Sequence, residues 1–225
     1  MSVQNLLEQL LKSGMGQYES ARQSGDLGKY ATGAAAGGAL ALLLGSKRGR
    51  SLGGKALKIG TVAALGTLAW KAYNDWQARQ QAAAPQPAAG APQGSPSVPG
   101  FAALPAPQLE DHSRAMLKAM IAAAKSDGHM DDRERAALEA ELQRLEADPA
   151  VRAWVDAELR RPVEPADVAA ASTSPQMAAE MYLASVLVAD DTTTMERAYL
   201  DELARQLRLP TELKADLEAR ARSAG

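Results

Sequence analysis

Apolar side chains in the second half of the chain recur every three to four residues, which is the spacing of one face of an α-helix. The first such stripe ends at Asp127-Gly128, where glycine can adopt the left-handed conformation that closes a helix. Thr193 and Glu196 have the spacing of a capping box and predict a helix start. The pattern carries no strand signal and predicts an all-α domain of about six to seven short helices over residues 109–225.

Proline and tryptophan positions add detail to this helical domain. Pro162 and Pro165 are expected to frame a short helix, and Trp154 is expected in the core. Further helix starts are predicted where a polar residue precedes proline, at Asp148-Pro149 and Ser174-Pro175.

The N-terminal segment, residues 1–29, opens with an amphipathic pattern. Ser2 is a suitable N-cap for a helix whose apolar stripe consists of Leu6, Leu7, Leu10 and Leu11. Such a helix either lies on a membrane or packs against a partner, and its spacing does not choose between the two.

Residues 30–80 form a Gly/Ala-rich region that we expect to be membrane-associated. Its first part, residues 30–46, has seventeen residues without a charge, the lower edge of what a membrane-spanning helix needs. Small residues recur at every fourth position from Gly33 to Gly53, a spacing that lets helices associate closely in lipid and predicts homo-oligomers. The alternative is a flexible Gly/Ala loop. The small positions are Gly33, Gly37, Ala41, Gly45, Gly49 and Gly53.

A second apolar stretch, residues 59–70, is too short to cross a bilayer alone. Tyr73 and Trp76 follow it, and such aromatics favour the boundary between lipid and water. The stretch is therefore interpreted as the return arm of a hairpin or as a helix lying in the interface. A single span and a hairpin would place residues 109–225 on opposite sides of the membrane.

Five basic residues without an acidic neighbour separate the two apolar stretches. They favour contact with anionic lipid headgroups on the cytoplasmic face. Nucleic acid is the rival partner, but no recognition motif or stacking aromatics accompany these charges, and we expect no nucleic acid. The basic residues are Lys47, Arg48, Arg50, Lys55 and Lys58.

Residues 81–108 are rich in proline, and no residue from Gln81 to Leu109 is charged. This composition predicts a disordered, extended linker. The charge balance changes across it. Residues 1–80 carry ten Lys/Arg against four Asp/Glu, and residues 110–225 carry fifteen against twenty-three. The net charge of -2 therefore hides a basic front half and an acidic back half.

Composition argues against a classical enzyme. The chain has no cysteine, which excludes disulfides, thiolate metal sites and a Cys nucleophile. Its two histidines leave little material for a His-based metal cluster or a catalytic triad. His112 is expected to be solvated and His129 to lie in an exposed loop.

Two acidic turns are the candidate chemistry of the domain. The pattern Glu-Arg-Ala-x-Leu occurs at residues 134–138 and again at 196–200, each time after an acidic turn. Converging carboxylates suit a hard divalent cation such as Ca²⁺ or Mg²⁺. The alternative is that these acids only cap helix N-termini. The candidate metal ligands are Asp127, Asp131, Glu134, Asp190, Asp191 and Glu196.

Residues 115–140 and 178–209, including Ala122 to Gly128 and Glu196 to Leu200, resemble the TerB-like tellurite-resistance domain. With its apolar front and Pro-rich linker, the whole chain resembles the YebE-like bacterial inner-membrane proteins. The resemblance implies a two-repeat helical domain whose acidic residues are proposed to chelate a metal, which maps to Asp127, Asp131 and Glu134 in the first repeat. The second repeat departs from this pattern, because Asp190-Asp191 lacks the following glycine.

These observations support two functional hypotheses. The first is a non-catalytic, membrane-tethered binding or sensing module of the bacterial inner membrane that binds an unidentified protein partner and a divalent metal. The second is a structural envelope-stress scaffold that self-associates through its glycine-rich segment and binds no metal.

Overall fold

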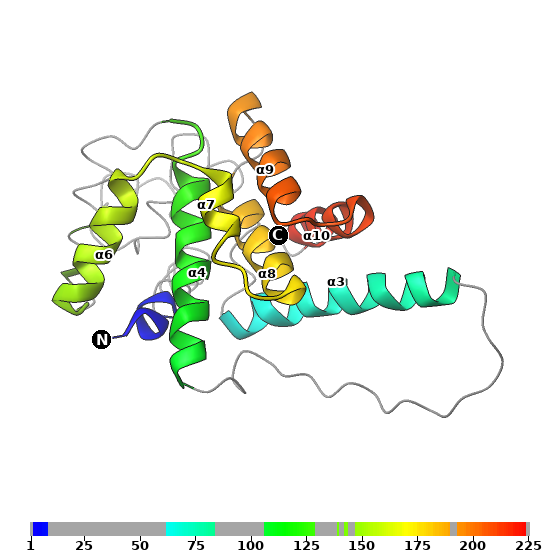
Figure 1. Ribbon diagram of the computed structural model, residues 1–225, viewed down its shortest axis with the longest axis horizontal. Helices are drawn as coiled ribbons and strands as arrows, with labels where there is room; N and C mark the ends of the chain where they lie inside the picture. The colour runs from blue at the N-terminus through cyan, green and yellow to red at the C-terminus, as the bar shows by residue number, and fades with distance from the viewer. Residues whose placement is uncertain are drawn as a thin grey trace, which may run out of the picture.

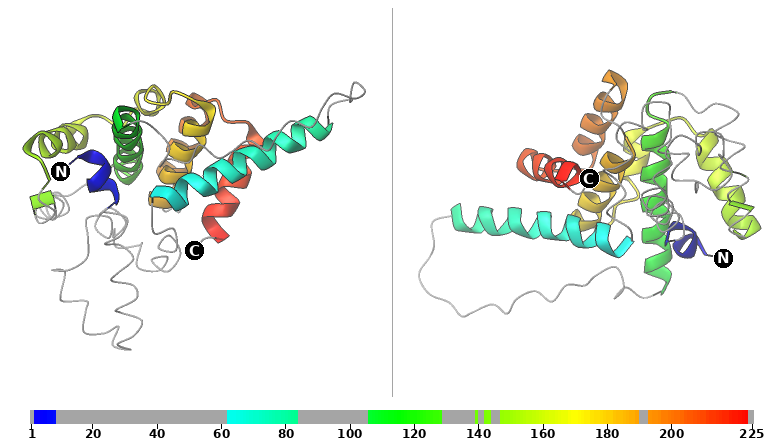
Figure 2. Two further views of the ribbon diagram at one scale, coloured as in Figure 1. Left: turned by 90° about the horizontal axis from the view of Figure 1, so that it is seen from below. Right: turned by 180° about the vertical axis from the view of Figure 1, so that it is seen from behind.

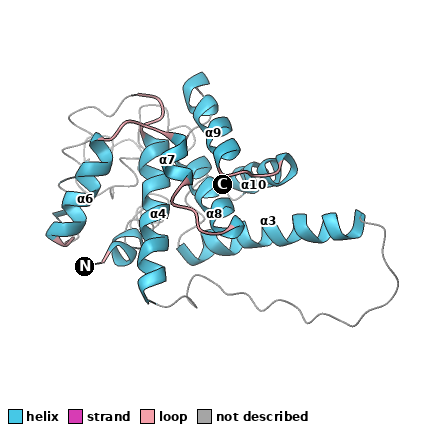
Figure 3. Ribbon diagram, in the orientation of Figure 1, coloured by secondary structure: helices cyan, strands magenta, loops and turns pink. Residues whose placement is uncertain are grey.

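The computed structural model describes residues 2–8, 62–83, 106–128, 139, 142–143, 147–189 and 193–223. All regular structure among these residues is helical, which confirms the all-α prediction (Figures 1 and 3). The helices are α3 (Val62–Ala83), α4 (Ala106–Ala124), α6 (Pro149–Arg160), α7 (Pro165–Ala169), α8 (Pro175–Val188), α9 (Thr194–Gln206) and α10 (Thr211–Ser223), and residues 3–8 are also helical.

The core is built around α8, which α3, α4, α9 and α10 contact (Figure 1). A helix that is apolar on all sides belongs in the interior, and most of α8 is buried. Tyr182 and Leu183 are fully buried at its centre. Trp154 of α6 packs against the edge of this core, as predicted, with the guanidinium of Arg114 5.7 Å from its ring centroid.

Local capping explains where several helices begin and end. The side chain of Ser174 accepts a hydrogen bond of 3.1 Å from the Met177 amide at the start of α8. Thr193 and Glu196 form the predicted capping box of α9. Gly128, with φ of 79°, takes the left-handed conformation after α4. These predictions are confirmed, because each depends on neighbours in the sequence.

The prolines near α6 and α7 lie differently in the helices from what the sequence predicted. Pro149 begins α6, but Asp148 makes no side-chain cap hydrogen bond. Pro165 begins α7, whereas Pro162 lies in the connection after α6. The short helix therefore follows the second proline, since proline is favoured in the first helical turn and not in its interior.

The second apolar stretch continues as α3 and packs against α8 and α10. Leu65, Ala69 and Ala72 are buried on this face. The helical body therefore begins before residue 109, which differs from the predicted domain boundary. Small side chains allow the backbones of neighbouring helices to approach. Ala69 and Ala72 therefore suit packing of α3 against other helices of the chain.

Helices occupy both ends of the predicted linker, residues 81–108. Residues 81–83 complete α3, and residues 106–108 begin α4. The rest of the linker lies outside the described residues, as do residues 30–46 and the basic cluster. Among the helices described, none combines the length and apolar character required to cross a membrane.

Candidate functional site

The described parts of the two predicted acidic turns lie close together. Gly128 follows the C-terminal turn of α4, and a methyl group placed on it would lie 3.7 Å from Cε of Met195, in the first turn of α9. The neighbours of Asp127 and Glu196 are therefore near each other, although they are far apart in the sequence. We call residues 127–128 and 193–196 the paired turns.

Glu196 caps the N-terminus of its own helix, α9. Its side chain is buried, and its Oε2 accepts hydrogen bonds from the Thr193 amide at 3.1 Å and the Thr193 hydroxyl at 2.8 Å. The Glu196 amide donates in return to Thr193 Oγ1. This geometry matches the alternative in which the carboxylate satisfies backbone groups at a helix N-terminus.

The candidate metal ligands are only partly described. Asp127 is half-buried in the turn after α4, whereas Asp131, Glu134, Asp190 and Asp191 lie outside the described residues. Within the described residues, no three His, Cys, Asp or Glu side chains gather closely enough to hold a metal ion. The donors fit a hard cation in kind, since all are carboxylate oxygens.

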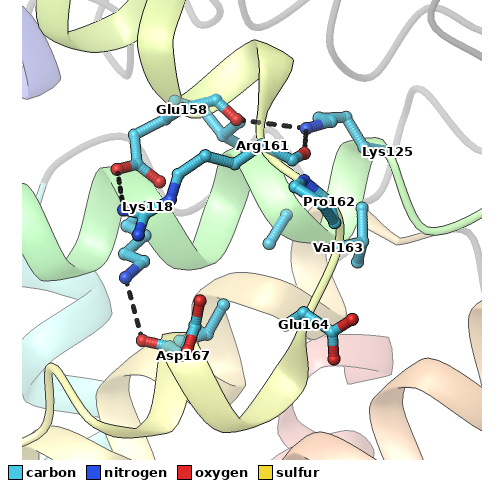
Figure 4. A pocket seen from close by; sticks show the side chains of 11 residues that line it. Lys118, Lys125, Glu158, Arg161, Pro162, Val163, Glu164 and Asp167 are labelled. Carbon is cyan, nitrogen blue, oxygen red and sulfur yellow. Dashed lines mark hydrogen bonds and ion pairs between the residues drawn. The ribbon is translucent and has the colours of Figure 1, made fainter.

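A second concave site lies between α4, α6 and α7 and is lined by three cations and three acids (Figure 4). Its cavity of about 20 Å³ holds about one water molecule. Lys125 Nζ donates to the carbonyls of Glu158 at 3.1 Å and Arg161 at 2.5 Å, at the end of α6. Lys118 Nζ donates to the carbonyl of Asp167 at 2.9 Å, in α7. The two lysines therefore fasten helices to α4.

His112 is not the solvated residue that was expected. Its Nε2 lies 2.6 Å from Oε2 of Glu180, and the two side chains are 11% and 13% exposed. The pair joins α4 to α8 at the edge of the core. The sequence contained one signal for it, because Glu180 is the single charged residue of an otherwise apolar helix. Its partner could not be read from local spacing. His129 lies outside the described residues.

Other buried polar groups also hold helices together. The hydroxyl of Tyr182 donates to Oε1 of Glu218 at 2.7 Å, and Lys214 donates to the same oxygen at 2.7 Å. The Tyr182 bond joins α8 to α10. On α9, burial raises the pKa of the Tyr199 phenol well above its usual range.

Comparison with known proteins identifies the family. A family described as "Protein of unknown function (DUF533)" matches residues 29–221. An "Uncharacterized protein in ampR 5'region" of Yersinia enterocolitica is 26% identical over 110 residues, which cover 49% of this chain and 79% of that protein. No solved structure matches the chain. Since the family match covers most of the sequence, the chain belongs to the DUF533 family.

Proposed function

We propose that this DUF533 protein is a non-catalytic binding module, tethered to the bacterial inner membrane by residues 9–61, whose paired turns bind a divalent cation and a protein partner. The proximity of Gly128 to Met195 carries the proposal, because these residues belong to acidic turns from two sequence repeats. The likeness to TerB-like domains and YebE-like membrane proteins supports the same function.

Met195 supplies an apolar contact at the paired turns. Its side chain is 58% exposed, and it is the exposed large hydrophobic residue of the described part of the chain. Methionine is flexible and polarizable, so it adapts to varied partner surfaces. A cation held by carboxylates of both turns would fix the position of Met195 and thereby alter partner binding.

Calorimetric titration of the full chain, purified in mild detergent, with CaCl₂ and MgCl₂ tests the cation. We expect a binding heat that Asp127→Asn and Glu134→Gln each abolish. Glu164→Gln is the matched control, since Glu164 is exposed before α7 and makes no side-chain cap hydrogen bond. Absence of heat with both ions would overturn the metal-binding part of the proposal.

Sedimentation tests the tether. Membranes collected without detergent are expected to contain the protein, and recovery of the full chain in the supernatant would refute the tether. Vesicles with anionic headgroups should bind the chain more strongly than neutral vesicles, because the five basic residues at 47–58 would face the headgroups.

The scaffold is the second candidate, and the capping box of Glu196 favours it. A carboxylate already engaged by Thr193 needs no metal to account for its position. In this function the chain self-associates through the small residues between Gly33 and Gly53. Gly37→Leu would then reduce the oligomer mass measured by light scattering in detergent, whereas Gln81→Leu, outside this segment, would not.

A further inference from the structure

The N-terminal helix is bound to the helical body as an intramolecular ligand. Val3, Leu6 and Leu7 have at most 1% of their surface exposed. The Val3 amide donates to Oε1 of Glu110 at 3.1 Å, and the Gln4 amide donates to Oε2 of the same carboxylate at 3.4 Å. Glu110 belongs to α4 and serves as a cap supplied by another helix, where a negative charge is favoured.

At the other end of residues 9–61, α3 is bound to the same body. Beyond its buried apolar face, α3 is held by a charged contact, in which Arg220 Nη2 of α10 donates to Asp75 Oδ2 at 2.7 Å. The Arg220 side chain is 19% exposed, so this contact is partly shielded from water. Two further contacts join α3 to α10, Arg79 Nη2 to Asp216 Oδ2 at 3.6 Å and Gln80 Nε2 to Glu212 Oε2 at 3.2 Å.

The helices that flank residues 9–61 therefore both lie on one helical body. Figure 2 shows the N-terminal helix beside α4 and α3 beside α8 in views from two further directions. The hydrocarbon core of a bilayer is about 30 Å thick. If residues 30–46 crossed the bilayer once, its hydrocarbon core would separate Val3 from α3. The bonds from Val3 and Gln4 to Glu110 could not then form.

We infer that the N-terminal helix, α3 and the helical body lie on the same side of the membrane that tethers the chain. The inference rests on the membrane tether of the proposed function. It excludes a single span by residues 30–46, which is incompatible with the observed contacts. Residues 62–70 of the predicted return arm belong to α3 and pack on α8 and α10, so the contacts also exclude a hairpin that uses this arm. The part of the chain proposed to contact the membrane then lies between the N-terminal helix and α3, which both pack on the same helical body.

Cysteine labelling tests this topology cleanly, since the chain has no cysteine of its own. Asn5→Cys, Ala78→Cys and Ala157→Cys change exposed residues of the N-terminal helix, α3 and α6. A membrane-impermeant maleimide is added to intact spheroplasts and to permeabilised ones, and the membrane fraction is then collected. We expect the same pattern for all three variants, either labelling already in intact spheroplasts or labelling only after permeabilisation.

Labelling of Asn5→Cys from the side opposite to Ala157→Cys, in protein recovered with the membranes, would overturn the inference and leave the tether intact. Recovery of the protein in the supernatant would overturn the tether and the inference together. Hydrogen exchange adds a second measurement. Glu110→Ala should accelerate exchange of the Val3 and Gln4 amides, while Glu164→Ala should not, and equal rates in both variants would contradict the docking of the N-terminal helix.

Discussion

Arg208 has a backbone conformation that is uncommon for a residue with a side chain. Its φ is 55°, and it follows the end of α9, where the Leu209 amide donates to the Ala204 carbonyl at 3.0 Å. This hydrogen bond closes the helix in the manner of a Schellman motif, which favours glycine at the left-handed position. Leu209 and Pro210 connect this helix end to α10, which begins at Thr211.

Arg208→Gly is expected to stabilise the protein by about 0.5–1 kcal/mol, because glycine adopts positive φ without the steric cost of a Cβ atom. Thermal unfolding of the full chain measures the change. Ala215→Gly is the control with the opposite sign. Ala215 is exposed within α10, where glycine costs a helix about 1 kcal/mol. A lower melting temperature for Arg208→Gly would contradict the prediction.

Glu202 provides a pH-dependent contact on α9. Hydrogen bonds from Arg205 and Gln206 lower the pKa of Glu202 to about 2 from its ordinary value near 4.5. The folded state then binds its proton at lower pH than the unfolded state. The contribution to stability is present above about pH 4.5 and is lost as pH falls toward 2. Carbon-detected NMR titration should give this low pKa, and Arg205→Gln should raise it; a wild-type pKa near 4.5 would contradict the contact.

Lys125 and Lys118 offer a matched pair of side-chain-to-carbonyl contacts. Lys125→Met removes two donated hydrogen bonds at the end of α6 and should lower the free energy of unfolding by about 1–2 kcal/mol. Lys118→Met removes one exposed bond to α7 and should cost about 0.5 kcal/mol or less. Denaturant unfolding compares the two variants, and equal losses would contradict the role given to Lys125.

At the scale of elements, helix starts and ends were more predictable than helix partners. Ser174, Thr193 and Gly128 act through atoms within a few residues, so their sequence spacing was sufficient. The partner of α3 was not encoded locally. Its apolar residues suit lipid and protein interiors equally well, and only the complementary surface of α8 and α10 distinguishes the two. The N-terminal helix has the same ambiguity. Its sequence left open a membrane surface or a partner, and it docks instead on α4 of its own chain.

The close approach of α3 to its neighbours leads to a prediction at this scale. Ala72→Leu places a larger side chain at a fully buried position and should destabilise the protein by about 1–3 kcal/mol through overpacking. Ala78→Leu makes the same change at an exposed position of the same helix and should have little effect. Denaturant unfolding of the full chain measures both variants. Equal stabilities would indicate that α3 does not pack as described.

At the scale of the whole molecule, composition separated a basic front half from an acidic back half, but the helical body includes residues from both. Asp75 of the front half contacts Arg220 of the back half, so the charge division does not coincide with the packing. The candidate metal site was located only in part. The repeat identified Asp127 and Glu196, whose described neighbours lie close together, whereas the part-buried pair of His112 and Glu180 required the fold to bring two helices together.

The account depends most on α3 and α8 belonging to one folded body. Native-state hydrogen exchange of the full chain, in membranes or mild detergent, tests this directly by comparing the amides of residues 65–76 with those of α8. We predict slow exchange in both, with Asp75→Ala accelerating exchange in α3 more than in α8, because the variant removes the contact to Arg220. Exchange of residues 65–76 at the rate of an unstructured peptide, while α8 stays protected, would contradict the account.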